Sequence, residues 1–170
     1  MKNSQEKKRL FIASFAKIDN YRNIKQKLGP SFHGKWIPPE NLHMTYKFLG
    51  DIYNSDIIIQ KLKKLKYKKK QTVQFKKLKL FNKRILSLRS SNKTLYKIHD
   101  QIQELLGVEF PNEKVFKPHI TIMRVKKIKN KEFKELFKTL NPKGSLEIKI
   151  CLVQSKLTPN GVKYKIIREF

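Results

Sequence analysis

The sequence has a single cysteine, few acidic residues and no long apolar run. Cys151 alone excludes an internal disulfide and any site built from several cysteines, and its apolar surroundings over 148–153 predict a small buried side chain. No stretch approaches the roughly 18 apolar residues that a membrane span needs. The apolar segment 10–16 is too short for a signal peptide, contains Ser14 and lacks a small-residue cleavage site. We therefore expect no membrane association and a cytoplasmic location.

The shortage of acidic residues leaves a strongly positive chain, with 13 Asp and Glu against 40 Lys and Arg and a formal charge of +27. Such a surface attracts polyanions, of which nucleic acid is the commonest in the cytosol. Only six of the 40 basic residues are arginine. Lysine in such excess also fits a general residue bias, so RNA binding and compositional bias both stay open as explanations.

The remaining composition is that of one folded domain. A chain of 170 residues with 39% apolar and 11% aromatic residues is long enough to bury a sizeable core. We expect a single domain over 1–170, in which the polar residues 1–8 are loose.

Two copies of one short pattern stand out against this background. The run from His43 to Gly50 and the run from His119 to Val125 both read His-x-Thr within an alternation of apolar and other residues. That alternation is typical of a half-buried β-strand, on which His and Thr two places apart project from the same face. Either copy alone fits a core histidine beside a strand-favouring threonine, but the pair together predicts one site with two halves.

The rest of the chain alternates irregularly between predicted strands and helices, which indicates an α+β domain. We expect strands over 9–15, 43–50, 72–80, 84–88, 119–125, 147–153 and 162–167, and helices over 20–28, 55–66, 92–106 and 131–140. His33 is expected in an exposed loop, and His99 at the edge of a packed helix face.

The paired motifs and their flanks resemble the 2H phosphoesterase superfamily, and within it the RNA 2′,3′-cyclic phosphodiesterase family, also called the 2′-5′ RNA ligase family. The resemblance runs in order through nearly the whole chain and includes segments 9–13, 36–42, 48–50, 116–118 and 155–164. It implies two antiparallel β-sheet lobes flanked by helices around a central cleft, with the two motifs near a pseudo-two-fold axis.

Two imidazoles facing one phosphorus can supply a base for water and an acid for the leaving sugar oxygen. By the resemblance, His43 is the proton donor, His119 is the proton acceptor, and Thr45, Thr121 and Arg124 bind the phosphate. Arg124 lies an odd number of residues from His119, so an ideal strand would turn it away from the site. It reaches the phosphate only if the strand contains a bulge or ends there.

Lys47 has the spacing to approach the same site, although a solvated lysine is the simpler interpretation. Relatives carry a bulky aromatic more often where this chain has Ser87, which leaves base stacking at that position in doubt. No third ligand accompanies the two histidines and no glycine-rich phosphate loop is present, so we expect no metal and no cofactor such as ATP.

The resemblance implies hydrolysis of RNA ending in a 2′,3′-cyclic phosphate to a 2′-phosphate, with 2′-5′ ligation as the reverse reaction. Fragments of tRNA are one such substrate, and we expect a monomer. Two alternatives are a basic RNA-binding protein without activity and a sister 2H enzyme acting on 2′-5′ oligoadenylates or cyclic nucleotides.

Overall fold

A computed structural model describes residues 6–111 and 115–170. The expectation of a loose segment over 1–8 falls largely outside these residues, because 1–5 are not described. It is wrong for Lys8, which already pairs with Ile52 in an antiparallel ladder.

The chain forms four α-helices, eleven strands and two short 3-10 turns within the described ranges. The helices are α1 (Tyr21–Leu28), α2 (Asp56–Leu62), α3 (Lys93–Leu106) and α4 (Phe133–Thr139), and the 3-10 turns cover Gly29–Ser31 and Pro39–Asn41. The strands are β1 (Lys8–Phe15), β2 (Lys17–Ile18), β3 (Phe32–Trp36), β4 (His43–Ile52), β5 (Thr72–Phe75), β6 (Lys77–Phe81), β7 (Ile85–Arg89), β8 (His119–Ile128), β9 (Gly144–Glu147), β10 (Cys151–Thr158) and β11 (Gly161–Glu169).

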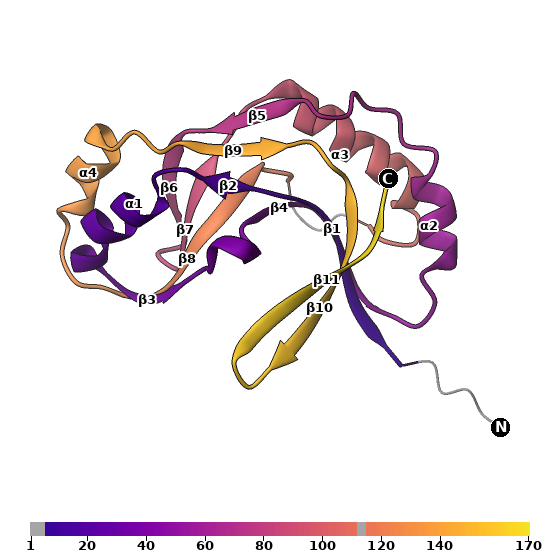
Figure 1. Cartoon of the computed structure of the whole chain (residues 1–170), viewed down its shortest axis with the longest axis horizontal. Helices are drawn as coiled ribbons and strands as arrows, with labels where there is room; N and C mark the ends of the chain where they lie inside the picture. Colours follow the sequence, from indigo (N-terminus) through magenta and orange to yellow (C-terminus); the bar gives the residue numbers. More distant parts are fainter. Residues whose placement is uncertain (1–5, 112–114) are drawn as a thin grey trace.

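These strands make two antiparallel sheets, which confirms the predicted α+β class. The larger sheet has the order β11-β10-β1-β4-β8-β7-β6, with β3 also paired to β8, and the smaller has the order β2-β9-β5. Both motif strands, β4 and β8, belong to the larger sheet and are direct neighbours in it. In Figure 1, α3 runs beside β5 at the top, while α1 and α4 lie together at the left.

One face of the larger sheet packs against the main hydrophobic core. Met44 and Ile120 point into this core from β4 and β8, together with Phe75 of the smaller sheet. Helix α3 adds a buried stripe at helical spacing, made of Leu95, Ile98, Ile102 and Leu106. Its first turn is fixed by Asn92, whose side-chain oxygen accepts a hydrogen bond from the backbone N–H of Thr94 at 2.9 Å. The side chains between the core positions of β4 and β8 therefore lie on the opposite face.

Two sequence-based expectations about the sheets were wrong. The segment 72–80 is two strands, β5 in the smaller sheet and β6 in the larger, because Phe75 and Leu78 both turn into the core and the alternation breaks between them. His33 lies in strand β3 and not in a loop, although its side chain is exposed as expected. Helix α2 is also shorter than predicted and ends at Leu62.

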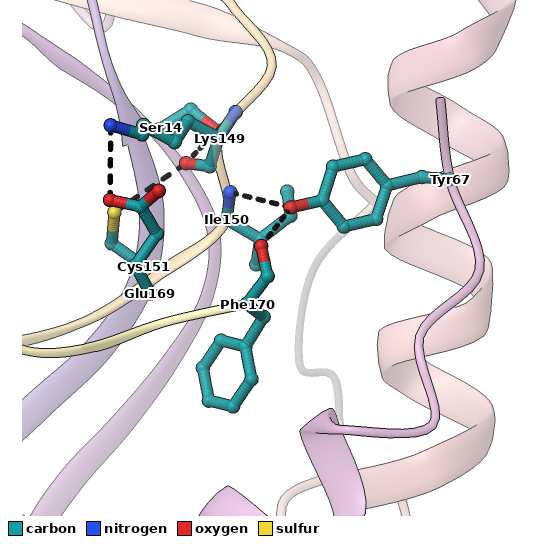
Figure 2. Close-up of polar contacts among 7 residues, drawn as sticks. All are labelled: Ser14, Tyr67, Lys149, Ile150, Cys151, Glu169 and Phe170. Atoms are coloured by element: carbon teal, nitrogen blue, oxygen red, sulfur yellow. Dashed lines mark hydrogen bonds and ion pairs between the residues drawn. The ribbon is translucent and has the colours of Figure 1, made fainter. Parts of the chain in front are cut away.

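The hairpin of β10 and β11 projects from the larger sheet and is anchored at its base. Figure 2 shows the Tyr67 hydroxyl donating to the backbone oxygen of Phe170 at 2.5 Å and accepting from the backbone N–H of Ile150 at 3.3 Å. Lys149 and Glu169 form an ion pair at 3.1 Å beside it. These contacts fix the start of β10 and the end of β11, and so they position the hairpin beside β1.

Candidate functional site

The two motif strands are structural copies of each other. Both β4 and β8 have ten residues, and their side chains follow the same sequence of buried, intermediate and exposed positions from the first residue to the last. His43 and His119 each occupy the first position, and Thr45 and Thr121 each occupy the third. The internal symmetry expected from the repeated motif is therefore present in the structure of the two strands.

The register of the two strands brings the four motif side chains together. Met44 pairs with Ile120 in an antiparallel bridge. Continuing that register by one residue in each direction sets His43 opposite Thr121 and Thr45 opposite His119. Because Met44 and Ile120 face the core, the histidines and threonines share the other face of the sheet. The structure thus places one imidazole and one hydroxyl from each half in a single group.

Arg124 reaches this face because β8 contains a β-bulge. Ser87 pairs with Thr121 whereas Leu86 pairs with Met123, so β8 has one extra residue between these pairs. The bulge shifts the alternation, so that Met123 is buried and Arg124 is exposed. A side chain at the neighbouring Gly34 of β3 would place its Cβ 2.1 Å from the backbone oxygen of Arg124, so only glycine fits there.

The same bulge occurs in β4 and reverses two expectations. Thr45 pairs with Ala13 and Lys47 with Ile12, so that β4 also carries an extra residue after its threonine. Strict alternation would put Phe48 on the same face as Met44, but Phe48 is 75% exposed, and Lys47, expected toward the site or solvent, is 4% exposed. The Lys47 ammonium donates to the Gln103 side-chain oxygen at 2.6 Å. Burial lowers the pKa of Lys47.

Both histidines are oriented by the same backbone contact. Nδ1 of His43 lies 2.7 Å from the backbone oxygen of Asn41, and Nδ1 of His119 lies 2.7 Å from that of Lys117. A carbonyl only accepts, so Nδ1 must carry the proton in each ring. Nε2 is consequently the nitrogen that can gain or lose a proton in both halves.

The pKa values of both histidines are lowered, mainly because burial disfavours the charged ring. The backbone contact at Nδ1 opposes this effect in each case. The positive charges of His119 and Arg124 lower the pKa of His43 further, while the charge of Arg89 does the same for His119. His43 therefore lies within electrostatic range of both His119 and Arg124, and His119 within range of Arg89.

The surroundings of the two rings differ, and sequence reasoning missed them. His43 is packed by Phe11 at 5.2 Å and by Tyr164 at 5.0 Å between ring centroids, the latter edge-on, with Phe15 at 6.2 Å. His119 has one ring neighbour among the described residues, Phe81 at 5.7 Å.

Arg89 lies on the outer side of His119. It pairs with His119 across the β7–β8 ladder, and its guanidinium lies over the Phe81 ring at 4.5 Å. The sequence signal that could have found it is its rarity, as one of six arginines, directly after the predicted strand 84–88.

The remaining groups fit the binding of an anion. Within the described ranges, the hydroxyls of Thr45 and Thr121 have no hydrogen-bond partner in the protein, and neither Arg89 nor Arg124 forms an ion pair with a carboxylate. The same part of the chain holds no group of three His, Cys, Asp or Glu side chains that could bind a metal ion. Ser87 is fully buried, so it offers no nucleophile at the surface.

Two His-x-Thr pairs that share one face of neighbouring strands, on a fold of this topology, are the pattern of a 2H phosphoesterase. The family model described as LigT like Phosphoesterase matches residues 16–87 and again residues 86–164, so that each match contains one motif. The chain therefore belongs to the family of LigT-like phosphoesterases.

Curated relatives are similar over most of their length. An RNA 2′,3′-cyclic phosphodiesterase of Methanocaldococcus jannaschii is 36% identical over 183 residues, covering 95% of this chain and 99% of the relative. A protein of the same name from Aquifex aeolicus is 33% identical over 163 residues, covering 86% of each chain. These identities extend the relationship beyond the two motifs.

Solved structures have the same fold. A crystal structure of E. coli LigT complexed with 3′-AMP superposes with a TM-score of 0.75 at 18% identity, covering 97% of this chain and 98% of that one. A structure from Thermus thermophilus gives a TM-score of 0.72 at 24% identity, covering 95% and 96%. None of the helices in the described ranges combines the length and apolarity required to span a membrane.

Proposed function

We propose that this phosphoesterase is an RNA 2′,3′-cyclic phosphodiesterase. The observation that carries the proposal is the group formed by His43, Thr45, His119, Thr121 and Arg124 on one face of two symmetry-related strands. The names of the curated relatives support the same substrate. The strongly basic chain supplies the electrostatic attraction that an RNA substrate requires.

In the proposed mechanism, His119 is the proton acceptor and His43 is the proton donor. Neutral His119 takes a proton from water through Nε2 as the water oxygen attacks phosphorus. The bond from phosphorus to the 3′-oxygen breaks, and protonated His43 gives its Nε2 proton to that oxygen. The products are a 3′-hydroxyl and a 2′-phosphate.

The charge that develops on the non-bridging oxygens is met by three donors. Thr45 and Thr121 donate hydroxyl hydrogen bonds, and Arg124 adds a charge-assisted one. A bound dianionic transition state also favours the protonated form of His43, whose pKa is lowered in the free protein by burial and by neighbouring positive charge.

The proposed substrate also bears on the partner of the protein, its location and its oligomeric state. An RNA with a 2′,3′-cyclic phosphate end, such as a tRNA fragment, is the proposed partner, and the protein acts as a cytoplasmic monomer without a metal or cofactor.

The direct test uses an oligoribonucleotide ending in a 2′,3′-cyclic phosphate, incubated with the protein in EDTA. We expect complete conversion to the 2′-phosphate, identified by its resistance to a 3′-specific phosphatase and by chromatography against both standards. A 3′-phosphate product would contradict the assignment of acid and base to the leaving 3′-oxygen. Binding of the RNA without turnover would instead favour the alternative of a basic RNA-binding protein.

A further inference from the structure

A groove of about 870 Å³ lies between the turn that joins β6 to β7, the end of β8 and the start of α4. Its floor is apolar, because Leu80, Ile128 and Phe133 pack there against the main hydrophobic core. The motif side chains lie on the opposite face of the larger sheet from that core. The groove is therefore separate from the candidate site. Helix α4, which forms one wall of it, is at the left end of the molecule in Figure 1.

The rim of this groove is positively charged beyond the general excess of lysine. Basic residues make up 40 of the 170 in the chain but six of the eleven that line the groove, and none of the eleven is acidic. Among the residues that the structure describes, none of the six forms an ion pair with a carboxylate. The six are Lys83, Arg84, Lys126, Lys129, Lys131 and Lys134. A compositional bias spread evenly over the surface would not concentrate them here.

A tight turn fixes the first wall of the groove. The backbone N–H of Arg84 donates to the backbone oxygen of Phe81 at 2.8 Å, and the two residues between them, Asn82 and Lys83, have φ angles of 45° and 55°. Asparagine tolerates this left-handed conformation, whereas lysine rarely adopts it and glycine would do so without strain. The turn itself therefore does not call for a lysine at position 83, where the side chain is exposed at the rim.

The opposite wall is held by the side chain of Asn130. Its oxygen accepts from the Ser31 hydroxyl at 2.8 Å and from the backbone N–H of Glu132 at 3.0 Å. The backbone N–H of Lys129 donates to the backbone oxygen of Ser31 at 2.8 Å. The loop between β8 and α4 is thus tied to the segment before β3. Cations on a fixed backbone bind an extended anion with little loss of conformational entropy.

The distance from the motifs decides which part of an RNA could reach the groove. Thr121 and Lys126 are five residues apart on β8, which corresponds to about 16 Å of strand. A stacked nucleic-acid strand rises about 3.4 Å per nucleotide, so about five nucleotides are needed to cover that distance. The path around the edge of the sheet adds to this length. A mononucleotide or dinucleotide in the site therefore cannot contact the groove.

We propose that this groove binds the sugar-phosphate backbone of the substrate RNA, at least about five nucleotides away from the cyclic-phosphate end. This inference rests on the proposed function and extends it from the reacting end of the RNA to its body. Lysine and arginine contacts to phosphates carry no sequence information and weaken steeply with salt. The groove would thus favour long RNA over short oligonucleotides without taking part in the chemistry.

The experiment compares two substrates with the same cyclic-phosphate end, a dinucleotide and an RNA of about 20 nucleotides, which is long enough to reach the groove. The groove variant is Lys83→Ala/Arg84→Ala/Lys129→Ala. Its matched control is Lys64→Ala/Lys66→Ala/Lys68→Ala, which removes the same charge from exposed positions after α2, at the right of Figure 1.

We expect the groove variant to lose at least about tenfold in kcat/KM on the long RNA, through KM and not kcat. Its kcat/KM on the dinucleotide should stay within about twofold of the parent, as for ordinary surface substitutions. The slope of log kcat/KM against log salt on the long RNA should become shallower by about two, since three phosphate contacts to a single strand are lost. The control should match the parent on both substrates.

Binding measured without turnover separates the groove from the chemistry. Fluorescence anisotropy with an RNA of the same length ending in a 3′-hydroxyl should show at least about tenfold weaker affinity for the groove variant. Equal losses in groove variant and control would overturn the proposal, because net charge alone would then explain binding. Displacement of this RNA by polyglutamate at equal charge concentration would overturn the assignment to RNA. If the parent hydrolyses neither substrate, the proposed function fails, while the anisotropy still decides the groove.

Discussion

Strands β4 and β8 share one backbone design but place their histidines in different chemical surroundings. Each strand begins with histidine, carries threonine at the third position and contains a bulge that exposes the sixth residue. That sixth residue is Phe48 in β4 and Arg124 in β8. His43 is enclosed by Phe11, Phe15 and Tyr164, and His119 is flanked by Phe81 and Arg89.

The difference teaches how two strands of the same design can give their histidines different electrostatic surroundings. The shared backbone contact at Nδ1 assigns the same tautomer to both rings, so the strands alone do not distinguish them. The two rings are therefore distinguished by the side chains that surround them. Burial is the main cause of the lowered pKa of both rings, and His119 and Arg124 lower the pKa of His43 further, whereas Arg89 lowers that of His119.

Removal of either histidine should have the largest effect. We expect His43→Ala and His119→Ala each to lower kcat by at least about a hundredfold, the low end of general acid or base contributions. The pH profiles should then differ. His119→Ala should lose the decline of rate at low pH, and His43→Ala the decline at high pH. Rate profiles from pH 5 to 9 test this assignment, and identical profiles in both variants would contradict distinct roles.

Substitution of the sixth residue of strand β8, Arg124, should have the next largest effect. Arg124→Ala removes the charge-assisted hydrogen bond that we propose to the phosphate, so we expect a loss of about 1.5–3 kcal/mol of transition-state stabilisation, or roughly ten- to a hundredfold in kcat/KM. Phe48→Ala, at the equivalent place in β4, should change kcat/KM by less than about threefold, in the range of ordinary surface substitutions. Steady-state kinetics on the cyclic phosphate measure both, and equal losses would mean that the two halves bind substrate alike.

Both lowered histidine pKa values predict that stability falls in acid. The unfolded chain has histidine pKa values of about 6.5 and binds more protons below that pH than the folded chain does. This part of the stability is therefore complete above pH 6.5 and is lost as the pH falls through the lowered folded values. We expect Tm to drop more steeply from pH 7.5 to 5 in the parent than in His43→Gln/His119→Gln. Parallel slopes in thermal melts would show that neither ring resists protonation.

The smallest effect is expected where the strands differ on their core side. Lys47 in β4 occupies the place of Met123 in β8, and both are buried. Lys47→Met removes a buried charge and its hydrogen bond to Gln103 while keeping the length of the side chain. Because these contributions oppose each other, we expect the free energy of unfolding to change by less than about 1 kcal/mol. Urea denaturation measures it, and a loss above about 3 kcal/mol would indicate a structural ion site.

The sequence predicted the shared face of the two motifs because alternation needs only local spacing. The positions of His43, Thr45, His119 and Thr121 follow from that rule. The rule of alternation failed for Lys47 and Phe48, because the bulge depends on the pairing of β4 with β1 and has no signature in the local sequence. For Arg124 the need for a bulge could be stated in advance, but its presence was visible only in the ladder with β7.

Contacts that join distant segments were beyond prediction for a similar reason. Arg89 and Phe81 reach His119 only after β6, β7 and β8 are aligned side by side. Tyr164 reaches His43 because the C-terminal hairpin is anchored beside β1. Residues of this kind have no common spacing to the motifs, so composition and periodicity do not reveal them.

The close contact at Gly34 ties the placement of Arg124 to a residue that lies outside both motifs. The main chain that carries Arg124 rests directly against a residue without a side chain, at a distance that would leave 2.1 Å for a methyl group. A single added carbon there would push the strand away and displace the guanidinium that we propose to bind the phosphate, without changing either histidine or either threonine. The absence of a side chain at position 34 is therefore a steric requirement for the backbone that presents Arg124.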